Sequence, residues 1–194
     1  MLHCCPKVPL GMQDPMSDVA VLVIDMLNTY RHEDAELLVP NVANIVDPLA
    51  GLIHEARERD NVDVVYVNDN YGDFTADFDD IVRSALEGKR PDMVRPIVPE
   101  KHCLRVLKVR HSAFYASSLD YLLRRLEARR LVVTGQVTEQ CILYSALDAY
   151  IRHFSVVVAP DAVAHIDPEL SDAALTMMHK NMHAEIVPAA KCLG

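Results

Sequence analysis

The sequence predicts an α/β fold in which helices cover both faces of a parallel sheet. Short runs of Val, Ile and Leu recur along the chain without the polar alternation of a half-exposed strand, as expected for strands buried on both faces. Amphipathic helical patterns separate these runs, and such alternation is typical of α/β sheets. The 194 residues suffice for one domain with a substantial core. We therefore expect a single domain over residues 1–194, with residues 1–17 as an N-terminal arm.

The elements follow one another along the chain in a regular order. Five apolar runs are the expected strands: Val19–Ile24, Val64–Val67, Leu104–Val109, Leu131–Val133 and Val156–Val158. A weaker sixth run is Ala184–Val187. Helical spacing brings apolar residues to one face in four segments between them: Val42–Ala56, Leu119–Leu126, Ile142–Ala149 and Ala173–Met178.

Two stretches interrupt this regularity. Pro48 lies inside the first helical pattern, so either the helix kinks there or Asp47 caps a new helix that begins with Pro48. The connection from Asn68 to His102 is rich in Gly and Pro, with a short helix expected around Asp80–Glu87. Long connections in compact domains often shape binding sites.

Composition and charge argue against several classes of protein. The net charge of -9 at pH 7 argues against nucleic acid and anionic membranes as partners. No apolar run approaches the roughly 18–20 residues of a membrane helix, and the start lacks the apolar core of a signal peptide. The five cysteines include no CxxC pair, which argues against a zinc ribbon or a thioredoxin-type motif. We expect a cytoplasmic protein with reduced thiols.

Three polar residues lie where the expected strands end, the edge at which open parallel sheets bind ligands. Asp25 follows the first strand, Lys108 closes the third, and Cys141 begins the helix after the fourth. A carboxylate can take the proton of a thiol, while an ammonium and a helix N-terminus both favour the thiolate. Singly, each residue is more often a cap, a solvated charge or a core cysteine. Their shared edge favours a catalytic set, whereas Asp69 and Asp161 are expected as caps or walls of the site.

The same residues belong to three longer motifs. These are Val23–Tyr30, Lys108–Phe114, and Thr134–Cys141 followed by Ser145–Ala149. The first is similar to Ile-Asp-x-Gln-Asn-Asp-Phe and the second to Lys-x-x-x-Ser-Ala-Phe. In these motifs, from about Val19 to Val187, the chain resembles the isochorismatase-like cysteine hydrolases, which include nicotinamidases, N-carbamoylsarcosine amidase and ureidoacrylate amidohydrolase.

The resemblance implies a fold and a site. The fold is a three-layer α-β-α arrangement with a six-stranded parallel sheet, a Rossmann-like hydrolase fold. Asp25, Lys108 and Cys141 are implied as the catalytic triad. A cis peptide is implied between Gln136 and Val137, with an oxyanion hole formed by the backbone N–H groups of Val137 and Cys141. The resemblance also implies a homo-oligomer, a dimer or a tetramer.

Departures from the family motifs reduce the number of reactions expected for this chain. Metal-dependent nicotinamidases carry an Asp-x-His pair after the second strand; here Asp69 is present, but Tyr71 stands where the histidine is needed and His102 is isolated. We therefore expect no metal and no cofactor. Leu27 replaces the glutamine of the first motif. Isochorismatases that act on a vinyl ether generally lack the nucleophilic cysteine, which Cys141 supplies here.

The sequence thus predicts a metal-independent cysteine amidohydrolase that cleaves a C–N bond of a small amide or ureide through a Cys141 thioester. Vinyl ether hydrolysis of the isochorismatase type, and a non-catalytic binding domain on the same fold, remain alternatives. The expected partner is a small-molecule amide-type substrate.

Aromatic and cationic residues near the motifs are candidates for substrate contacts. Four aromatic residues are expected pocket walls, with core packing as the alternative: Tyr30, Tyr71, Phe74 and Phe114. For Phe114 the two interpretations have equal weight. Arg31, Arg110 and His111 either meet a substrate carboxylate or lie solvated on the surface.

Overall fold

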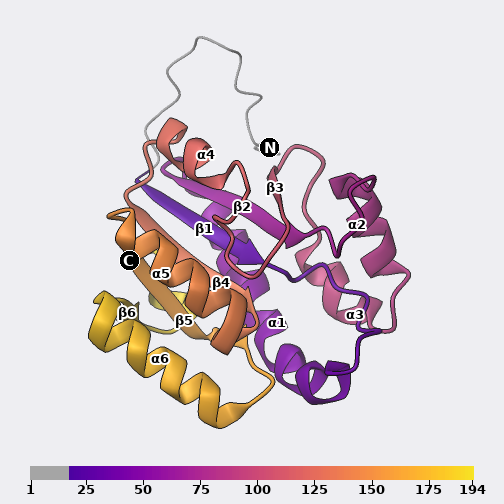
Figure 1. Cartoon of the computed structure of the whole chain (residues 1–194). Helices are drawn as coiled ribbons and strands as arrows, with labels where there is room; N and C mark the ends of the chain where they lie inside the picture. Colours follow the sequence, from indigo (N-terminus) through magenta and orange to yellow (C-terminus); the bar gives the residue numbers. More distant parts are fainter. Residues whose placement is uncertain (1–17) are drawn as a thin grey trace.

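A computed structural model describes residues 18–194; the expected N-terminal arm lies outside these residues. A single sheet runs through the middle of the molecule (Figure 1). Its strands are β1 Val19–Ile24, β2 Val62–Asp69, β3 Leu104–Lys108, β4 Arg130–Gln136, β5 Ser155–Ala164 and β6 Glu185–Ile186. All neighbouring strands pair in parallel, in the order β3-β2-β1-β4-β5-β6. The predicted six-stranded parallel sheet is confirmed.

Helices cover both faces of this sheet. The α-helices are α1 Ala35–Arg57, α2 Phe78–Leu86, α3 Pro91–Val94, α4 Leu119–Arg125, α5 Leu143–Ile151 and α6 Pro168–Met182. Short 3-10 turns span Arg95–Ile97 and Ala189–Lys191, and a π-helical turn spans Thr138–Ile142. In Figure 1, α4, α5 and α6 lie in front of the sheet and α1 lies behind it. The three-layer prediction is therefore confirmed as well.

The alternation of side chains along β1 shows why its sequence is apolar throughout. Ala20, Leu22 and Ile24 point into the core beneath α4, α5 and α6. Val21 and Val23 point into the other core, which α1 covers. Because both faces of the strand are buried, every position requires an apolar side chain.

Helix α1 resolves the question that Pro48 left open. One helix continues through Pro40 and Pro48, so Asp47 does not cap a second helix. Each proline removes a backbone hydrogen bond, but the buried apolar face of the helix packs against β2 and β5 and holds it in place. By length and composition alone, α1 could also cross a membrane. Its packing against the sheet is that of a core helix.

Most expected elements differ by a few residues from those observed, and two of these differences have a visible structural cause. The strand predicted at Val156–Val158 continues to Ala164 as β5, past Pro160 and Asp161. Its pairing with β4 shifts register between Val133 and Gly135, which accommodates this irregular sequence. The short helix expected around Asp80–Glu87 is α2, which begins slightly earlier, behind an Asp77 capping box.

Gly135 allows β1 and β4 to come close at the edge where the site forms. Its φ is +111°, a conformation that only glycine adopts readily. A Cβ at this position would lie 2.0 Å from the carbonyl oxygen of Ile24, the residue that precedes Asp25. Any side chain at Gly135 would therefore push β1 and its terminal aspartate away from β4.

Replacement of Gly135 by alanine is expected to lower the free energy of unfolding by at least about 3 kcal/mol, because backbone strain and a backbone clash add. Gly51 is the matched control. It lies inside α1, and no atom outside the adjacent helix backbone lies within 4 Å of the position that a Cβ would take, so Gly51→Ala should stabilise by about 0.5–1 kcal/mol. Urea unfolding of both variants tests the contrast; equal, small effects would contradict it.

Candidate active site

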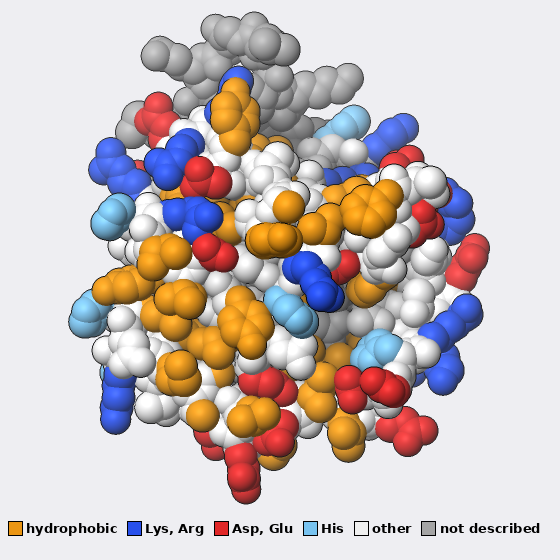
Figure 2. Space-filling model, viewed as in Figure 1, with side chains coloured by type: hydrophobic (Ala, Val, Ile, Leu, Met, Phe, Trp, Pro, Cys, Tyr) orange, Lys and Arg blue, Asp and Glu red, His pale blue; other side chains and the backbone are white. Residues whose placement is uncertain are grey.

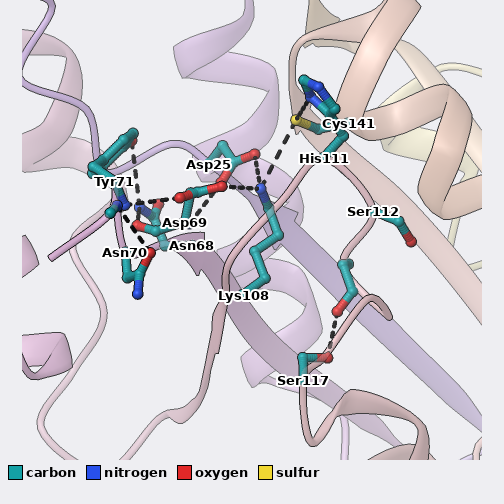
Figure 3. Close-up of polar contacts among 12 residues, drawn as sticks. Asp25, Asn68, Asp69, Asn70, Tyr71, Lys108, His111, Ser112, Ser117 and Cys141 are labelled. Atoms are coloured by element: carbon teal, nitrogen blue, oxygen red, sulfur yellow. Dashed lines mark hydrogen bonds and ion pairs between the residues drawn. The ribbon is translucent and has the colours of Figure 1, made fainter. Parts of the chain in front are cut away.

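Lys108 is the centre of a polar cluster at the carboxyl edge of the sheet (Figure 3). Its ammonium, at the end of β3, lies 2.8 Å from Asp25 Oδ2 and 3.2 Å from Asp69 Oδ2. The same Nζ atom lies 3.9 Å from the Sγ of Cys141. Lys108 is only 1% exposed and Asp25 7% exposed. The structure therefore brings Asp25, Lys108 and Cys141 together in a largely buried cluster.

The pKa shifts within this cluster follow from burial and charge. Burial raises the pKa of the Asp25 carboxyl above its usual value, although the Lys108 ammonium acts against the shift. Burial lowers the pKa of Lys108, but the Asp25 carboxylate and the other nearby anionic groups outweigh this effect and raise it. Lys108 is therefore a stable cation beside a carboxyl group whose proton affinity is increased.

The pKa of Cys141 shifts in the opposite direction to the sequence expectation, in which the helix N-terminus and Lys108 lower it. Burial and the Asp25 carboxylate instead raise the pKa of the thiol above its usual value, and together they outweigh the lowering effect of Lys108. The resting thiol is consequently protonated at neutral pH, and a thiolate forms only when a base takes its proton.

A π-helical turn carries Cys141. This turn, Thr138–Ile142, joins the end of β4 to α5, so the thiol lies just before the regular helix. Such turns are rare and frequently mark functional sites. The peptide bond between Gln136 and Val137 is cis, and the backbone N–H of Val137 donates to the sulfur of Cys141. Of the two predicted oxyanion donors, the Val137 N–H thus lies beside the thiol.

Side chains from two other strands fix the backbone that carries Asp25. Asp25 has a φ of +54°, an unusual conformation for a residue other than glycine. Gln136 Nε2 donates to the Asp25 carbonyl oxygen at 2.5 Å. Asn68 pairs with Leu27 on both sides, accepting from its N–H at 3.1 Å and donating to its carbonyl at 3.3 Å. The hydroxyl of Tyr71 also donates to the Leu27 carbonyl, at 3.1 Å. Although Leu27 lacks the family's side-chain amide, Asn68 and Gln136 supply amides to this segment.

Tyr30, Tyr71 and Phe74, three of the four aromatic residues expected as pocket walls, differ in how far they are exposed to solvent. Tyr30 is 1% exposed in the core under α1, which favours the packing interpretation. Tyr71 presents an exposed ring while its hydroxyl is buried against Asn68 and Leu27; burial raises the pKa of that hydroxyl well above its usual value. Phe74 is 80% exposed on the surface. Of these three, Tyr71 contacts the segment that carries Asp25.

Phe114 packs in the core away from the thiol. Its ring lies 6.2 Å from that of Phe154, and the guanidinium of Arg152 lies 4.9 Å above it. Arg152 follows the C-terminus of α5, whereas Cys141 precedes the N-terminus of that helix. The structure therefore favours core packing over a pocket wall for Phe114.

The contacts of two residues with the cluster, Asp69 and His111, were missed by sequence reasoning. Asp69, expected as a cap or wall, forms a second ion pair with Lys108, and its backbone N–H donates to Asp25 Oδ1 at 2.9 Å. His111 places Nδ1 3.9 Å from the sulfur of Cys141 while its ring remains exposed. His111 lies three residues after Lys108, and this spacing was the only signal of its position.

The remaining polar candidates lie elsewhere. Arg31 donates to the Glu87 carbonyl at 2.8 Å, and Arg110 is exposed. Asp161 accepts the backbone N–H of Ala189 at 2.8 Å, which agrees with the expected capping role.

The residues around Asp69 do not resemble a metal centre. The two Asp69 oxygens accept from Lys108 and from the backbone N–H of Tyr71, and the Tyr71 hydroxyl is engaged with Leu27. Over residues 18–194, no group of three or more His, Cys, Asp and Glu side chains is arranged to hold a metal ion. The local donor set is therefore that of an ion-pair network.

Comparisons with known proteins identify the family to which this fold belongs. The isochorismatase domain family matches residues 19–191. The uncharacterized isochorismatase family protein YaaI of Bacillus subtilis is 33% identical over 170 residues, covering 88% of this chain and 93% of the relative. Maleamate amidohydrolase of Pseudomonas putida is 30% identical over 159 residues, covering 77% and 74%.

A solved structure also superposes on nearly the whole fold. N-carbamoylsarcosine amidase from Thermoplasma acidophilum has a TM-score of 0.72 and is 26% identical, covering 91% of this chain and 99% of that one. The likeness therefore extends over the sheet and the helices on both of its faces.

The charge distribution predicts opposite responses of the thiol to two substitutions. The Asp25 carboxylate raises the pKa of Cys141 and Lys108 lowers it. Asp25→Asn should therefore increase the thiolate fraction at pH 8 and speed alkylation of Cys141 by iodoacetamide several-fold, whereas Lys108→Met should slow it. Rates are read by mass spectrometry of the Cys141 peptide, with Cys103 as the internal reference.

Asp69→Asn is the matched control, because Asp69 pairs with Lys108 but is not a direct partner of the thiol. It should change alkylation less than Asp25→Asn does. A slower or unchanged rate in Asp25→Asn would contradict the assigned charge state.

Proposed function

The chain belongs to the isochorismatase family and is a hydrolase, and from this premise we propose that it is a metal-independent cysteine amidohydrolase acting on a small amide or ureide. One observation carries the proposal: a single buried ammonium, Lys108 Nζ, lies 2.8 Å from the Asp25 carboxylate and 3.9 Å from the Cys141 sulfur. A base, a cation and a nucleophile therefore share one cluster, which is the arrangement that nucleophilic catalysis requires.

Activation begins with proton transfer from Cys141 to Asp25. This transfer moves a negative charge from carboxylate to sulfur without adding charge to the buried cluster, and Lys108 lies close to both atoms. Burial has already raised the pKa of Asp25, so the carboxylate is a stronger base than an exposed aspartate. These features support Asp25 as the general base and Lys108 as the group that stabilises the anion in either position.

The thiolate then attacks the amide carbonyl carbon, and the C–N bond breaks after a tetrahedral intermediate. The backbone N–H groups of Val137 and Cys141 hold the oxyanion, an interaction for which the loss of one donor typically costs about 3–4 kcal/mol. Protonated Asp25 gives its proton to the departing nitrogen, which leaves a thioester on Cys141. Asp25 next takes a proton from water, whose oxygen attacks the thioester and releases the acid and the thiol.

The substrate class is drawn from the relatives and from the thiol. Maleamate amidohydrolase and ureidoacrylate amidohydrolase, the latter 26% identical over 201 residues, are named for small linear amide-type substrates. We propose the same class here, in a cytoplasmic homo-oligomer of two or four chains that has neither nucleic acid nor membrane as a partner. Vinyl ether hydrolysis of the isochorismatase type would not use a nucleophilic thiol, so Cys141 argues against it. A non-catalytic binding domain would not need Asp25, Lys108 and Cys141 to lie together, so their clustering argues against that alternative.

Turnover is expected to depend on the thiol of Cys141. In a screen of small amides and ureides read by ammonia release, Cys141→Ala should reduce turnover by about a thousandfold or more, because no covalent intermediate can form. The wild type should show a Cys141 acyl adduct by mass spectrometry after rapid acid quench. Cys103→Ser serves as the control and should retain activity. Full turnover by Cys141→Ala would exclude the mechanism.

Chelation should leave the activity unchanged. The oxygens of Asp69 accept from Lys108 and from the backbone N–H of Tyr71, so they are not free to bind a metal ion. None of the steps described above uses a metal. Turnover is compared before and after dialysis against EDTA and 1,10-phenanthroline, with metal content measured by mass spectrometry. Loss of activity that added zinc or iron restores would contradict the proposal.

A further inference from the structure

Lys108 has two carboxylate partners, whereas the proposed reaction uses only one of them. On the face of the molecule shown in Figure 2, charged side chains of both signs are scattered over the surface, where water can solvate them. Lys108 is 1% exposed, so its charge depends on protein groups instead. Its ammonium lies 2.8 Å from Asp25 and 3.2 Å from Asp69. Asp69 takes no part in the proton transfers described above, so its place beside the ammonium needs another explanation.

The proposed reaction removes the negative charge of Asp25 at two points. Asp25 first takes the proton of Cys141 and later takes a proton from water, and each time its carboxylate is neutral until that proton leaves. Once the sulfur has bonded to the substrate carbon, the thiolate charge has also moved away, to the oxyanion. At that stage, among the residues that the structure describes, Asp69 is the remaining anion in contact with the Lys108 ammonium.

The position of Asp69 does not depend on the charge of Asp25. Parallel pairing of β2 with β3 sets Asp69 beside Lys108, and the carbonyl of Lys108 accepts the backbone N–H of Asn70 at 3.0 Å. One carboxylate oxygen of Asp69 accepts the backbone N–H of Tyr71 at 2.8 Å, which leaves the other to accept from Lys108. The Asp69 side chain is 22% exposed, against 10% for Asp25, so its charge costs less to bury. Asp69 is therefore a fixed and partly hydrated anion.

We propose that Asp69 is a positioning residue: it is the permanent counter-ion of Lys108, and it keeps the ammonium charged and in place while Asp25 is protonated. This inference rests on the proposed hydrolase reaction, because that reaction is what neutralises Asp25. The pair of Lys108 and Asp69 stays neutral throughout the cycle. The one remaining negative charge of the cluster moves from Asp25 to the sulfur of Cys141 and then to the oxyanion.

The counter-ion role is tested without substrate by a double-mutant cycle on stability, measured by urea unfolding at neutral pH. Asp25→Asn imitates the protonated carboxyl, and Asp69→Asn removes the second charge but keeps the oxygen that accepts from Tyr71. All variants also carry Cys141→Ser, so that no thiolate can replace a missing anion. Each single substitution leaves Lys108 with one carboxylate, whereas the double variant removes both. The double variant should raise the unfolding equilibrium constant about tenfold or more beyond the product of the single effects.

Lys108→Met is the matched control, because it removes the cation that the double variant leaves unpaired. Added to the double variant, it should restore most of the lost stability, and it does so even where the double variant does not fold. Without it, the double variant should gain stability as the pH rises toward about 10, because a buried unpaired lysine binds its proton less tightly than an unfolded one. Tyr71 and His111, the other titratable groups beside the cluster, are present in every variant. A cycle without excess coupling, or a double variant that Lys108→Met does not rescue, would overturn the proposal.

Turnover of a small amide or ureide gives a second readout. Asp69→Asn should lower kcat about tenfold or more and leave KM nearly unchanged, because the interaction is needed only after substrate has bound. Loss of a negative charge lowers the pKa of neighbouring groups, so both limbs of the pH profile should move to lower pH. Asp73→Asn is the control: Asp73 likewise accepts the N–H two residues on, from Thr75 at 2.9 Å, but forms no ion pair within residues 18–194. It should keep the kcat and the pH profile of the wild type.

The two readouts separate failure of this inference from failure of the proposed function. A wild-type kcat and pH profile in Asp69→Asn, or an equal loss in Asp69→Asn and Asp73→Asn, would overturn the role of Asp69 and leave the amidohydrolase standing. A wild type that hydrolyses no amide or ureide would refute the proposed function. Excess coupling in the stability cycle would then still show that either carboxylate alone can neutralise Lys108.

Discussion

The rest of the site depends on the ion pairs that the buried ammonium of Lys108 forms with Asp25 and Asp69. A lysine that is 1% exposed is tolerated only if anions surround it, and the carboxylates of Asp25 and Asp69 do so at 2.8 and 3.2 Å. The cation in turn favours the ionised, basic form of Asp25, although burial raises the pKa of that carboxyl. It also lies close enough to the sulfur to stabilise the thiolate that forms when the thiol loses its proton. The same neutralisation of the Lys108 cation by nearby anions thus supports both the buried structure of the site and the proposed chemistry.

The fold achieves this balance of charges by bringing the ends of four strands, β1, β2, β3 and β4, to one edge of the sheet. Parallel pairing sets Asp69 of β2 directly beside Lys108 of β3. Gly135 permits β4 to approach β1 closely, and amide side chains from β2 and β4 hold the strained backbone that follows β1. The cluster is therefore part of the packing of the sheet rather than an addition to it, which explains why it is so fully buried.

The layers, the strands and the clustering of Asp25, Lys108 and Cys141 could be predicted from the sequence because those features leave local signals. Apolar runs identify buried strands, and polar residues directly after them identify the carboxyl edge. Contacts made across the sheet leave no such signal. The ion pair of Asp69 with Lys108 depends on strand register, and the core position of Phe114 depends on how its loop lies along α5. The raised pKa of Cys141 was not predicted for a related reason: helix position is readable from sequence, whereas burial beside a carboxylate is not.

The central claim is that Asp25 and Cys141 share one proton beside the Lys108 cation, with the proton on sulfur at rest. The most direct measurement is the ultraviolet thiolate absorbance of the wild type minus that of Cys141→Ser, titrated from acidic to alkaline pH. We expect no thiolate signal from Cys141 at neutral pH and its appearance only in the alkaline range. A Cys141 thiolate already present at neutral pH would contradict the claim.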